Sequence, residues 1–379
     1  MKKISLSSIL SQLLLLFFVI IWIIPTFGLF ISSLRDKDLL AISGWWTSLT
    51  TTEINEIYRM SGMEAQIEED GYFKIKGKLF EANSGKKIES FGINSKKINE
   101  FKIGDIAIFK DESEVIVDED GNYEWRSKTE FTKKKGKRLF TTSLSPPSFT
   151  LENYKEVLFK EGIGRAFINT MAVALPSTLI PLIICSFFAY SLTWMRFFGR
   201  DTLLAIIIAS LVVPLQMSLI PILTIYNDFG ALFGVAAKSY PGVWMAHTGF
   251  GLASTTFLLR NFLKSLPNEM MEAAKVDGAS HYDIFLRIII PLSIPAFASI
   301  FILQFLWCWN DLLVGLVFLD QVPSEIILTA KLKELLGSRG ENWEILTTGA
   351  FVSMTVPLFI FFALQRYFIR GLVAGSVKG

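Results

Sequence analysis

The chain has 379 residues, of which 51% are hydrophobic and only 19% are charged. A soluble domain usually carries about 25% charged residues, so lipid is the expected solvent for much of this chain. The net charge of +2 gives no support for nucleic-acid binding. Two histidines are too few for a His-rich metal site, and the two cysteines, Cys185 and Cys308, lie in apolar runs where we expect small core residues.

The N-terminal stretch 12–31 is the first predicted membrane span. A crossing takes about 20 predominantly apolar residues, and this run reaches that length. Lys2 and Lys3 precede it, as the charged region of a signal peptide would. However, the apolar run is longer than the roughly 7–15 residues of such a peptide, and no A-x-A cleavage site follows. We therefore expect residues 1–34 to hold an uncleaved N-terminus and the first transmembrane helix.

Residues 35–160 differ in composition and carry most of the charge of the chain. Short runs such as GYFKIKGKLF alternate apolar and charged positions, and glycines at Gly71, Gly77 and Gly121 mark turns. A segment of roughly 110–125 residues is long enough to bury a core of its own. The pattern predicts an inserted β-rich domain over 35–160.

Residues 161–379 form a predicted core of five further spans, at 166–193, 202–225, 241–262, 292–318 and 346–366. The third of these, PGVWMAHTGFGLASTTFLL within 241–262, is the least apolar because it is rich in glycine, serine and threonine. Small residues let helices approach closely, and hydroxyls bond across helices. We therefore expect this segment to be packed inside a bundle rather than to face lipid.

Lysine and arginine near the span ends set the predicted orientation, because cytoplasmic loops carry an excess of these residues. They gather before the first span, between the second and third, between the fourth and fifth, and after the sixth: Lys2, Lys3, Arg196, Arg200, Arg260, Lys264, Lys275, Arg287, Arg366, Arg370 and Lys378. Both termini are therefore predicted to be cytoplasmic and 35–160 to lie outside, since long segments are translocated largely regardless of charge.

The cytoplasmic stretch 263–291 begins with a predicted helix in SLPNEMMEAAKVDG. Ser265 fits an N-cap, Pro267 falls in the first turn, and Gly278 follows the end, which is the asymmetry that a helix requires. Glycine there permits a left-handed turn. Three residues are spaced to share a flat face that another surface could approach: Met270, Ala273 and Ala274.

A second helix is predicted directly after the glycine. Ser280 and Asp283 have the spacing of a capping box, and the apolar run IFLRIII should continue the helix until Pro291 disturbs it. The residues alone leave two interpretations open, an ordinary loop with interfacial helices or a docking site.

The spacing of these residues resembles the cytoplasmic signature of ABC importer permeases. Glu272, Ala273 and Ala274 are followed after three residues by Gly278 and, after nine further residues, by Ile-Ile-Ile-Pro at 288–291, with isoleucine at 290 where the signature has leucine. Further stretches resemble the maltose-type sugar permease family, at 167–180, 211–223, 305–319 and 364–379. The segment 35–160 is similar to the enlarged first external loop of α-glucoside-type permeases.

The resemblance implies an all-α polytopic membrane protein with about six transmembrane helices in the type I ABC importer permease fold, carrying an inserted β-rich extracytoplasmic domain. In that family the coupling loop rests in a cleft of a separate ATPase. Glu272 would contact the ATPase, Ala273 and Ala274 would permit close approach, and Gly278 would make the turn. The residues implied in docking are Glu272, Ala273, Ala274, Asp277, Gly278, Ser280, Asp283 and Pro291.

The same resemblance implies a transmembrane subunit that moves a carbohydrate, an oligosaccharide or α-glucoside-like sugar, by alternating access. Its partners would be a second homologous permease, two copies of a cytoplasmic ABC ATPase and an extracytoplasmic sugar-binding protein, in a bacterial or archaeal cytoplasmic membrane. The sequence contains no G-x-x-x-x-G-K-[ST] loop. We therefore expect no enzyme activity and no cofactor on this chain, with ATP and Mg used by the partner ATPase.

Polar side chains within spans mark a predicted substrate path, because such groups are costly in lipid and tend to face a cavity. The motif WCWND offers indole faces beside amide and carboxylate groups, a chemistry suited to sugars. The candidates are Gln216, Thr248, Ser254, Gln304, Trp307, Asn310 and Asp311. The alternative is that they join helices, and Asp311 could be an interfacial charge.

Three other classes of function predict features that differ from those of an importer. A membrane receptor with 35–160 as its sensor predicts a cytoplasmic signalling domain, for which the short stretch after residue 366 leaves little room. A secondary transporter predicts inverted repeats and an intramembrane carboxylate relay, and neither is visible in the sequence. An intramembrane enzyme would need a nucleophile or metal constellation that a single membrane histidine cannot supply.

Overall fold

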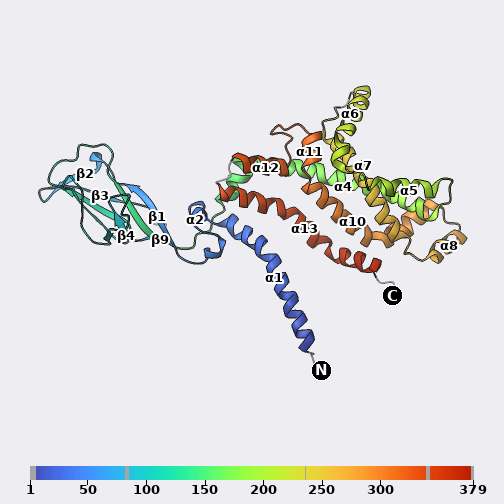
Figure 1. Ribbon diagram of the computed structural model, residues 1–379, viewed down its shortest axis with the longest axis horizontal. Coiled ribbons are helices and arrows are strands. Elements are labelled where there is room, and N and C mark those ends of the chain that lie inside the picture. The colour runs from blue at the N-terminus through green and yellow to red at the C-terminus, as the bar shows by residue number, and fades with distance from the viewer. Residues whose placement is uncertain (1–5, 82–84, 235, 339–341, 377–379) are drawn as a thin grey trace. The chain divides into compact units, whose positions relative to one another are not determined.

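The computed structural model describes residues 6–81, 85–234, 236–338 and 342–376, and it divides into two compact units. The first comprises Met1–Tyr154 and Glu341–Thr348, and the second comprises Lys155–Gly340 and Gly349–Gly379. Within the described residues, strands occur only in the first unit, and the second is helical (Figure 1). The predicted combination of a helical permease with an inserted β-rich segment is confirmed.

The first unit opens with α1 (Leu6–Leu34), and buried hydrogen bonds fix the chain that leaves this helix. The Arg35 guanidinium is 2% exposed and donates to the carbonyl oxygen and the hydroxyl of Ser43, both at 2.8 Å. Asn153 Nδ2 donates to the carbonyl oxygens of Ser33 at 3.1 Å and Arg35 at 2.8 Å. The two ends of the inserted segment are therefore tied to the C-terminal end of α1. Short helical turns flank this junction: α2 (Lys37–Ile42), η1 (Trp45–Thr47) and α3 (Glu152–Lys155).

Two antiparallel sheets make up the inserted domain. The first has the order β1-β9-β4-β5, and the second has the order β2-β3-β8-β7-β6. The strands, with one short helical turn, are β1 (Thr52–Arg59), η2 (Met63–Ala65), β2 (Gln66–Glu69), β3 (Tyr72–Lys78), β4 (Lys87–Gly92), β5 (Phe101–Lys102), β6 (Ala107–Ile108), β7 (Glu114–Val117), β8 (Asn122–Ser127) and β9 (Arg138–Ser145).

One apolar cluster joins the two sheets. Ile75 and Trp125 from the second sheet pack in the same cluster as Phe91 and Leu139 from the first. Strands β1 and β9, the first and last strands along the chain, pair along their whole length, from Thr52 opposite Ser145 to Arg59 opposite Arg138. The chain therefore enters and leaves the sheets at adjacent points. The sheets occupy Thr52–Ser145, a narrower range than the predicted 35–160.

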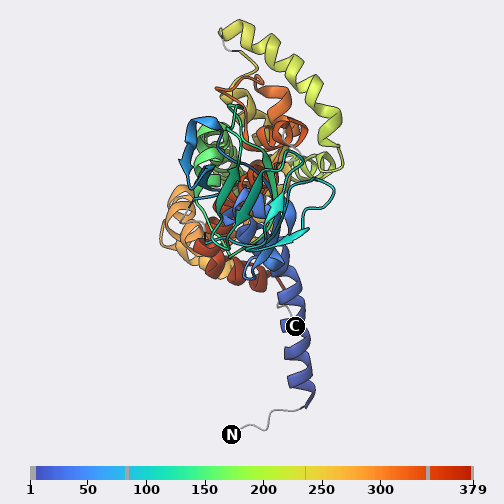
Figure 2. The same ribbon diagram turned by 90° about the vertical axis from the view of Figure 1, so that its left-hand side faces the viewer.

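The second unit is built from helices, which Figure 2 shows from a second side. Its elements are η4 (Glu156–Lys160), α4 (Ile163–Trp194), α5 (Arg200–Ser210), α6 (Leu215–Phe233), α7 (Tyr240–Leu263), α8 (Asn268–Val276), α9 (His281–Ile284), η5 (Phe285–Ile289), α10 (Ile290–Asn310), α11 (Leu313–Phe318), α12 (Leu328–Ser338) and α13 (Trp343–Ser376), of which the residues up to Thr348 belong to the first unit.

Helices α4, α7 and α10 pack against one another and form the centre of this unit. Gly251 allows a close approach of α7 to α10, since a Cβ atom there would lie 2.6 Å from Gln304 Nε2. Many of the small residues of α7 are buried, including Ala246, Thr255 and Thr256. The prediction that 241–262 lies inside the bundle is confirmed, and the reason is the one expected, that small side chains let helices approach.

The third predicted span, 202–225, is bent in the middle. Helices α5 and α6 meet at a break of 110° instead of forming one straight helix. Pro214 is the N-cap of α6, and a proline disfavours helical conformation in the residue before it. The bend therefore has a local cause that the sequence LVVP contains.

Four described helices are long and apolar enough to cross a membrane, and the number is five if α5 and α6 count as one broken span. The four cover Ser7–Leu34, Ile163–Trp194, His281–Asn310 and Trp343–Ile369. Helix α7, which carries the predicted span 241–262, is not among them, in keeping with its glycine, serine and threonine content. The predicted span 292–318 is also divided, because α10 ends at Asn310 and α11 is a separate helix.

Candidate functional site

Helix α8 carries the Glu-Ala-Ala motif, and it begins later than predicted. Its N-cap is Pro267, which has no side-chain capping bond. Ser265, the predicted cap, donates from its hydroxyl to the carbonyl oxygen of Phe262 at 2.6 Å. The serine therefore closes the end of α7, and the prediction that it caps α8 is wrong.

The two alanines of the motif face different ways. Met271 is 4% exposed and Ala274 is half-buried, and both pack in the same apolar cluster. Glu272 and Ala273 are exposed. In a helix, residues three apart share a face, so the inner stripe runs through Met271 and Ala274. The predicted flat face of Met270, Ala273 and Ala274 is not formed, and Ala273 with Glu272 belongs to the outer surface.

Gly278 ends α8 in the predicted left-handed turn, with φ of +82°. The amide of Ala279 donates to the carbonyl oxygen of Ala274 at 2.9 Å, and the amide of Gly278 donates to that of Lys275 at 3.0 Å. These two bonds define a Schellman motif, in which a positive φ at the residue after the C-cap satisfies the last carbonyl groups. Asp277 is the C-cap residue. The glycine therefore has a backbone role.

The capping box predicted for the second helix is present in part. The Ser280 hydroxyl accepts from the amide of Asp283 at 3.2 Å, and it donates to Asp283 Oδ2 at 2.5 Å. The Asp283 carboxylate also lies 3.6 Å from the Arg287 guanidinium. Helix α9 therefore starts at a fixed point directly after the glycine turn.

Pro291 disturbs the second helix, as predicted, but does not end it. The π-helical turn η5 joins α9 to α10, and Pro291 lies in the first turn of α10. A proline lacks the N–H that an α-helix would use, and its ring clashes with the carbonyl four residues earlier. The wider π turn, with the Ile290 amide donating to the carbonyl of Phe285, accommodates the proline while the helix continues.

The coupling loop 263–291 is anchored in one buried cluster that joins it to the three central helices. Its members come from α4 (Cys185, Ala189 and Tyr190), α7 (Leu259 and Leu263), α8 (Met271), the α9–η5 segment (Ile284, Phe285 and Ile289) and α10 (Ile300). Protein interiors are close-packed and have low compressibility. The coupling loop is therefore packed against α4, α7 and α10 rather than hanging free of them.

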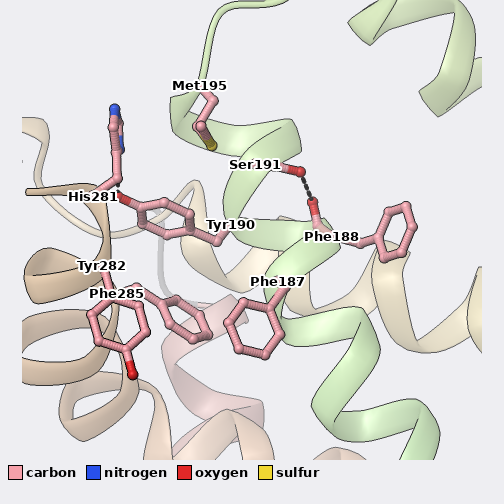
Figure 3. Close-up of a pocket in the computed structure, with 8 residues that line it drawn as sticks. All are labelled: Phe187, Phe188, Tyr190, Ser191, Met195, His281, Tyr282 and Phe285. Atoms are coloured by element: carbon pink, nitrogen blue, oxygen red, sulfur yellow. Dashed lines mark hydrogen bonds between the residues drawn. The ribbon is translucent and has the colours of Figure 1, made fainter.

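Tyr190 makes the polar contact of this anchorage, and sequence reasoning missed it. Its hydroxyl lies 2.8 Å from His281 Nδ1, and its ring packs edge-on against Phe285 with centroids 5.3 Å apart (Figure 3). The bond joins the end of α4 to the start of α9, 91 residues along the chain. No local pattern predicts such a pair, because it depends on tertiary packing.

A cavity of about 390 Å³ lies at this contact, between the end of α4 and the α9–η5 segment (Figure 3). It is lined by Phe187, Phe188, Tyr190, Ser191, Met195, His281, Tyr282 and Phe285. Most of these side chains are aromatic, so the cavity favours an apolar group over a hydrated ion. Among the described residues there is no group of three or more His, Cys, Asp or Glu side chains that could hold a metal ion.

The candidate substrate-path residues are mostly engaged in local bonds. Thr248 is buried and donates to the carbonyl oxygen of Trp244 at 2.7 Å, Ser254 donates to that of Gly251 at 3.2 Å, and Asn310 donates to that of Leu306 at 2.9 Å. These bonds lie within single helices.

Asp311 has a structural role at the start of α11. Its carboxylate accepts from the amides of Val314 at 2.8 Å and Gly315 at 3.3 Å. Its carbonyl oxygen accepts from the Thr329 hydroxyl at 2.7 Å. An acidic side chain that binds the free amides of a first helical turn is a capping residue.

The remaining candidates differ in exposure. Gln304 is 6% exposed at the contact between α7 and α10, whereas Gln216 is exposed near the start of α6. Trp307 is 37% exposed and meets His247 edge-on, with ring centroids 5.4 Å apart. Of the three, Gln216 and Trp307 keep an accessible polar or aromatic surface.

Comparison with known proteins identifies the family. A family model described as "Binding-protein-dependent transport system inner membrane component" matches residues 182–373. The chain is also 54% identical over 370 residues to the alpha-glucoside transport system permease protein AglG of Rhizobium meliloti (strain 1021), covering 98% of this chain and 96% of that protein. This chain belongs to the family of binding-protein-dependent transport system inner membrane components.

Other permeases are similar over shorter stretches. The permease is 50% identical over 240 residues to the osmoprotective compounds uptake permease protein GgtD of Synechocystis sp., covering 63% of this chain and 79% of that protein. A crystal structure of a bacterial ABC transporter involved in the import of the acidic polysaccharide alginate aligns at 26% identity with a TM-score of 0.47. It covers 59% of this chain and 82% of that chain.

Family membership identifies the chain as a multi-pass inner-membrane permease of a binding-protein-dependent ABC transport system. The resemblance drawn from the Glu-Ala-Ala signature is confirmed. The match to AglG spans nearly the whole chain and therefore includes the inserted domain. The receptor and secondary-transporter alternatives are not favoured.

Proposed function

We propose that this permease imports an α-glucoside or a similar oligosaccharide, as a transmembrane subunit of an ATP-driven transporter. The observation that carries the sugar class is the 54% identity to AglG over almost the full length of both proteins, since the name of that relative specifies alpha-glucoside transport. Transport would proceed by alternating access, in which helices move as rigid bodies between outward-facing and inward-facing arrangements.

The coupling loop would receive the force. Glu272 and Ala273 form the outer surface that would rest on the ATPase, while Met271 and Ala274 hold α8 to the central helices. Asp277, Gly278, Ser280 and Asp283 would fix the angle between α8 and α9, and Pro291 would carry the movement into α10. A helix that transmits movement between two proteins requires one exposed face for the partner and one buried face packed on its own protein.

The proposal puts both termini in the cytoplasm and 35–160 outside. The ends of α4 and α7 and the start of α10 meet at the coupling loop, so the basic residues near Arg196 and Lys275 share one side of the unit. That arrangement agrees with the excess of lysine and arginine on cytoplasmic sides. Lys2, Lys3 and Lys378, which supported the same orientation in the sequence, lie outside the described residues.

The partners would be a second homologous permease, two copies of a cytoplasmic ABC ATPase and an extracytoplasmic sugar-binding protein. Helix α6 supports a further membrane partner or lipid contact, because it exposes Met217, Ile220 and Leu232 by 74%, 63% and 77%. ATP and Mg would be bound by the ATPase and not by this chain. Sugar contacts on this chain would fall to Trp307 and Gln216, with the other candidate positions holding helices together.

Reconstitution tests the function directly. The permease, combined in proteoliposomes with the homologous permease, ATPase and binding protein of the same organism, should accumulate labelled maltose or another α-glucoside only when ATP is supplied. A β-galactoside should be taken up more slowly. Uptake driven by an ion gradient without ATP would contradict the proposal, and ATP-driven uptake of other solutes alone would contradict the sugar class.

A further inference from the structure

A second cavity lies beside α8, on the surface formed with the end of α4 and the loop to α5. It has a volume of about 540 Å³. The two segments that line it are more than sixty residues apart in sequence, and they contribute Thr193, Trp194, Met195, Arg196 and Arg200 on one side and Asn268, Met271, Glu272, Lys275 and His281 on the other. Half of its lining therefore comes from outside the coupling loop 263–291. We call it the basic pocket.

Positive charge predominates in the basic pocket. Arg196, Arg200 and Lys275 contribute three cations, and Glu272 contributes one carboxylate. Arg200 lies 3.2 Å from Asp201, which also lines a neighbouring cavity of about 430 Å³ beside Arg196 and Arg200. Among the described side chains, no ion pair within 4.0 Å involves Arg196, Lys275 or Glu272. Two cations and one carboxylate are therefore open to an external partner.

The chemistry of this lining selects a protein carboxylate. A guanidinium binds a carboxylate through two parallel hydrogen bonds, and Arg196 and Arg200 lie on the same wall. Glu272 repels any anion, and a doubly charged phosphate more than a carboxylate, so the lining favours a protein surface on which an acid lies next to a base. Met271 and Trp194 add apolar contact to the lining of the pocket. The pocket is also continuous with the outer surface of α8.

From these features we infer that the α4–α5 loop and α8 together form one docking surface, in which the basic pocket receives an acidic side chain of the ATPase subunit. This inference rests on the proposed function, because it assumes that α8 contacts an ATPase. It extends that contact to a second loop. The ATPase then holds the end of α4 as well as the coupling loop, so both move together when the ATPase closes.

Charge reversal at the pocket tests the inference in the assembled transporter. Arg196→Glu should weaken the binding of the ATPase to the permease by about tenfold or more, because like charges set opposite each other at an interface are costly. It should also reduce the dependence of binding on salt. Arg196→Gln should have a smaller effect in the same direction. Arg366→Glu, which changes an exposed cation of α13 outside the pocket, serves as the matched control and should bind as wild type does.

The outcomes separate the inference from the proposed function. Unchanged ATPase affinity in Arg196→Glu and in Arg200→Glu, with wild-type thermal unfolding, overturns the inference while leaving α8 as the docking helix. If Arg196→Glu loses affinity for vesicles that contain anionic lipid but still binds the ATPase, the inference is also overturned, and the pocket is assigned to lipid. If an acid-to-arginine substitution on the ATPase restores its binding to the Arg196→Glu permease, the inference is supported. If wild-type permease binds no ATPase at all, the proposed function itself fails.

Discussion

Replacement of Gly278 by valine should lower α-glucoside uptake per ATP hydrolysed by about tenfold while the permease still inserts and folds. The glycine has φ of +82°, and a Cβ atom there would meet no other atom within 4 Å. The cost is therefore conformational rather than steric, about 1–2 kcal/mol for a residue with a side chain in left-handed geometry. This conformational cost destabilises the turn between α8 and α9. Uptake and ATP hydrolysis measured in the same proteoliposomes give the ratio.

Gly234→Val is the matched control for this experiment. Gly234 ends α6 with φ of +68° and also has open space where a Cβ atom would be placed, but it lies between the predicted spans 202–225 and 241–262, outside the coupling loop 263–291. The same substitution should cost similar backbone strain there and leave the coupling ratio unchanged. Gly278→Asn should be milder than valine, because asparagine tolerates the left-handed region. Normal coupling in Gly278→Val, or equal loss in Gly234→Val, would contradict the role assigned to the turn.

Removal of the inserted sheets should leave the helical permease folded. Thr52 and Ser145 are opposite each other in the paired strands β1 and β9, so their Cα atoms are about 5 Å apart. Deleting 53–144 and joining the ends with a short Gly-Ser linker therefore needs no rearrangement of the chain that follows α1. The variant should reach the membrane in wild-type amounts, and the melting temperature of its helical part in detergent should stay close to that of the full chain.

A larger deletion of 35–150 provides the contrast. It removes the buried Arg35 guanidinium and the carbonyl group of that residue, which accepts from Asn153 Nδ2. Asn153 would lose a buried acceptor, and an unsatisfied buried polar group costs about 1–3 kcal/mol. This variant should melt at a lower temperature than the 53–144 deletion. Equal melting temperatures of the two deletion variants, or failure of both to insert into the membrane, would contradict the assignment of Thr52 and Ser145 as the limits of a separable domain.

The local geometry of the coupling loop follows from the sequence because caps act over short distances. The Gly278 turn and the bond from the Asp283 amide to Ser280 depend on residues within about five positions of each other. The same rules could have located the bend between α5 and α6, since Pro214 follows LVV in the middle of the predicted span. Asp311 likewise precedes an apolar run as a cap would, although the predicted span 292–318 runs through it.

The rest depends on contacts between distant residues. The bond between Tyr190 and His281 and the division of Ala273 and Ala274 between an outer and an inner face arise only when α8 packs on the central helices. The π turn before Pro291 depends on continuity with α10, whereas the isolated sequence IFLRIIIP predicts a disturbance at the proline without giving its form. Sequence patterns thus predicted that a two-helix element exists, and packing decided which of its residues face outward.

Site-specific photo-crosslinking at adjacent positions of α8 tests the central claim, that this helix docks on an ATPase. A photoreactive residue at the exposed Ala273 should yield an adduct with the ATPase subunit in the assembled transporter. The same residue at Ala274, which packs against the cluster of α4, α7 and α10, should yield little intermolecular product. An ATPase adduct from 273 and not from 274 is the predicted result. No ATPase adduct from 273, in a complex that still hydrolyses ATP and transports sugar, would contradict the account.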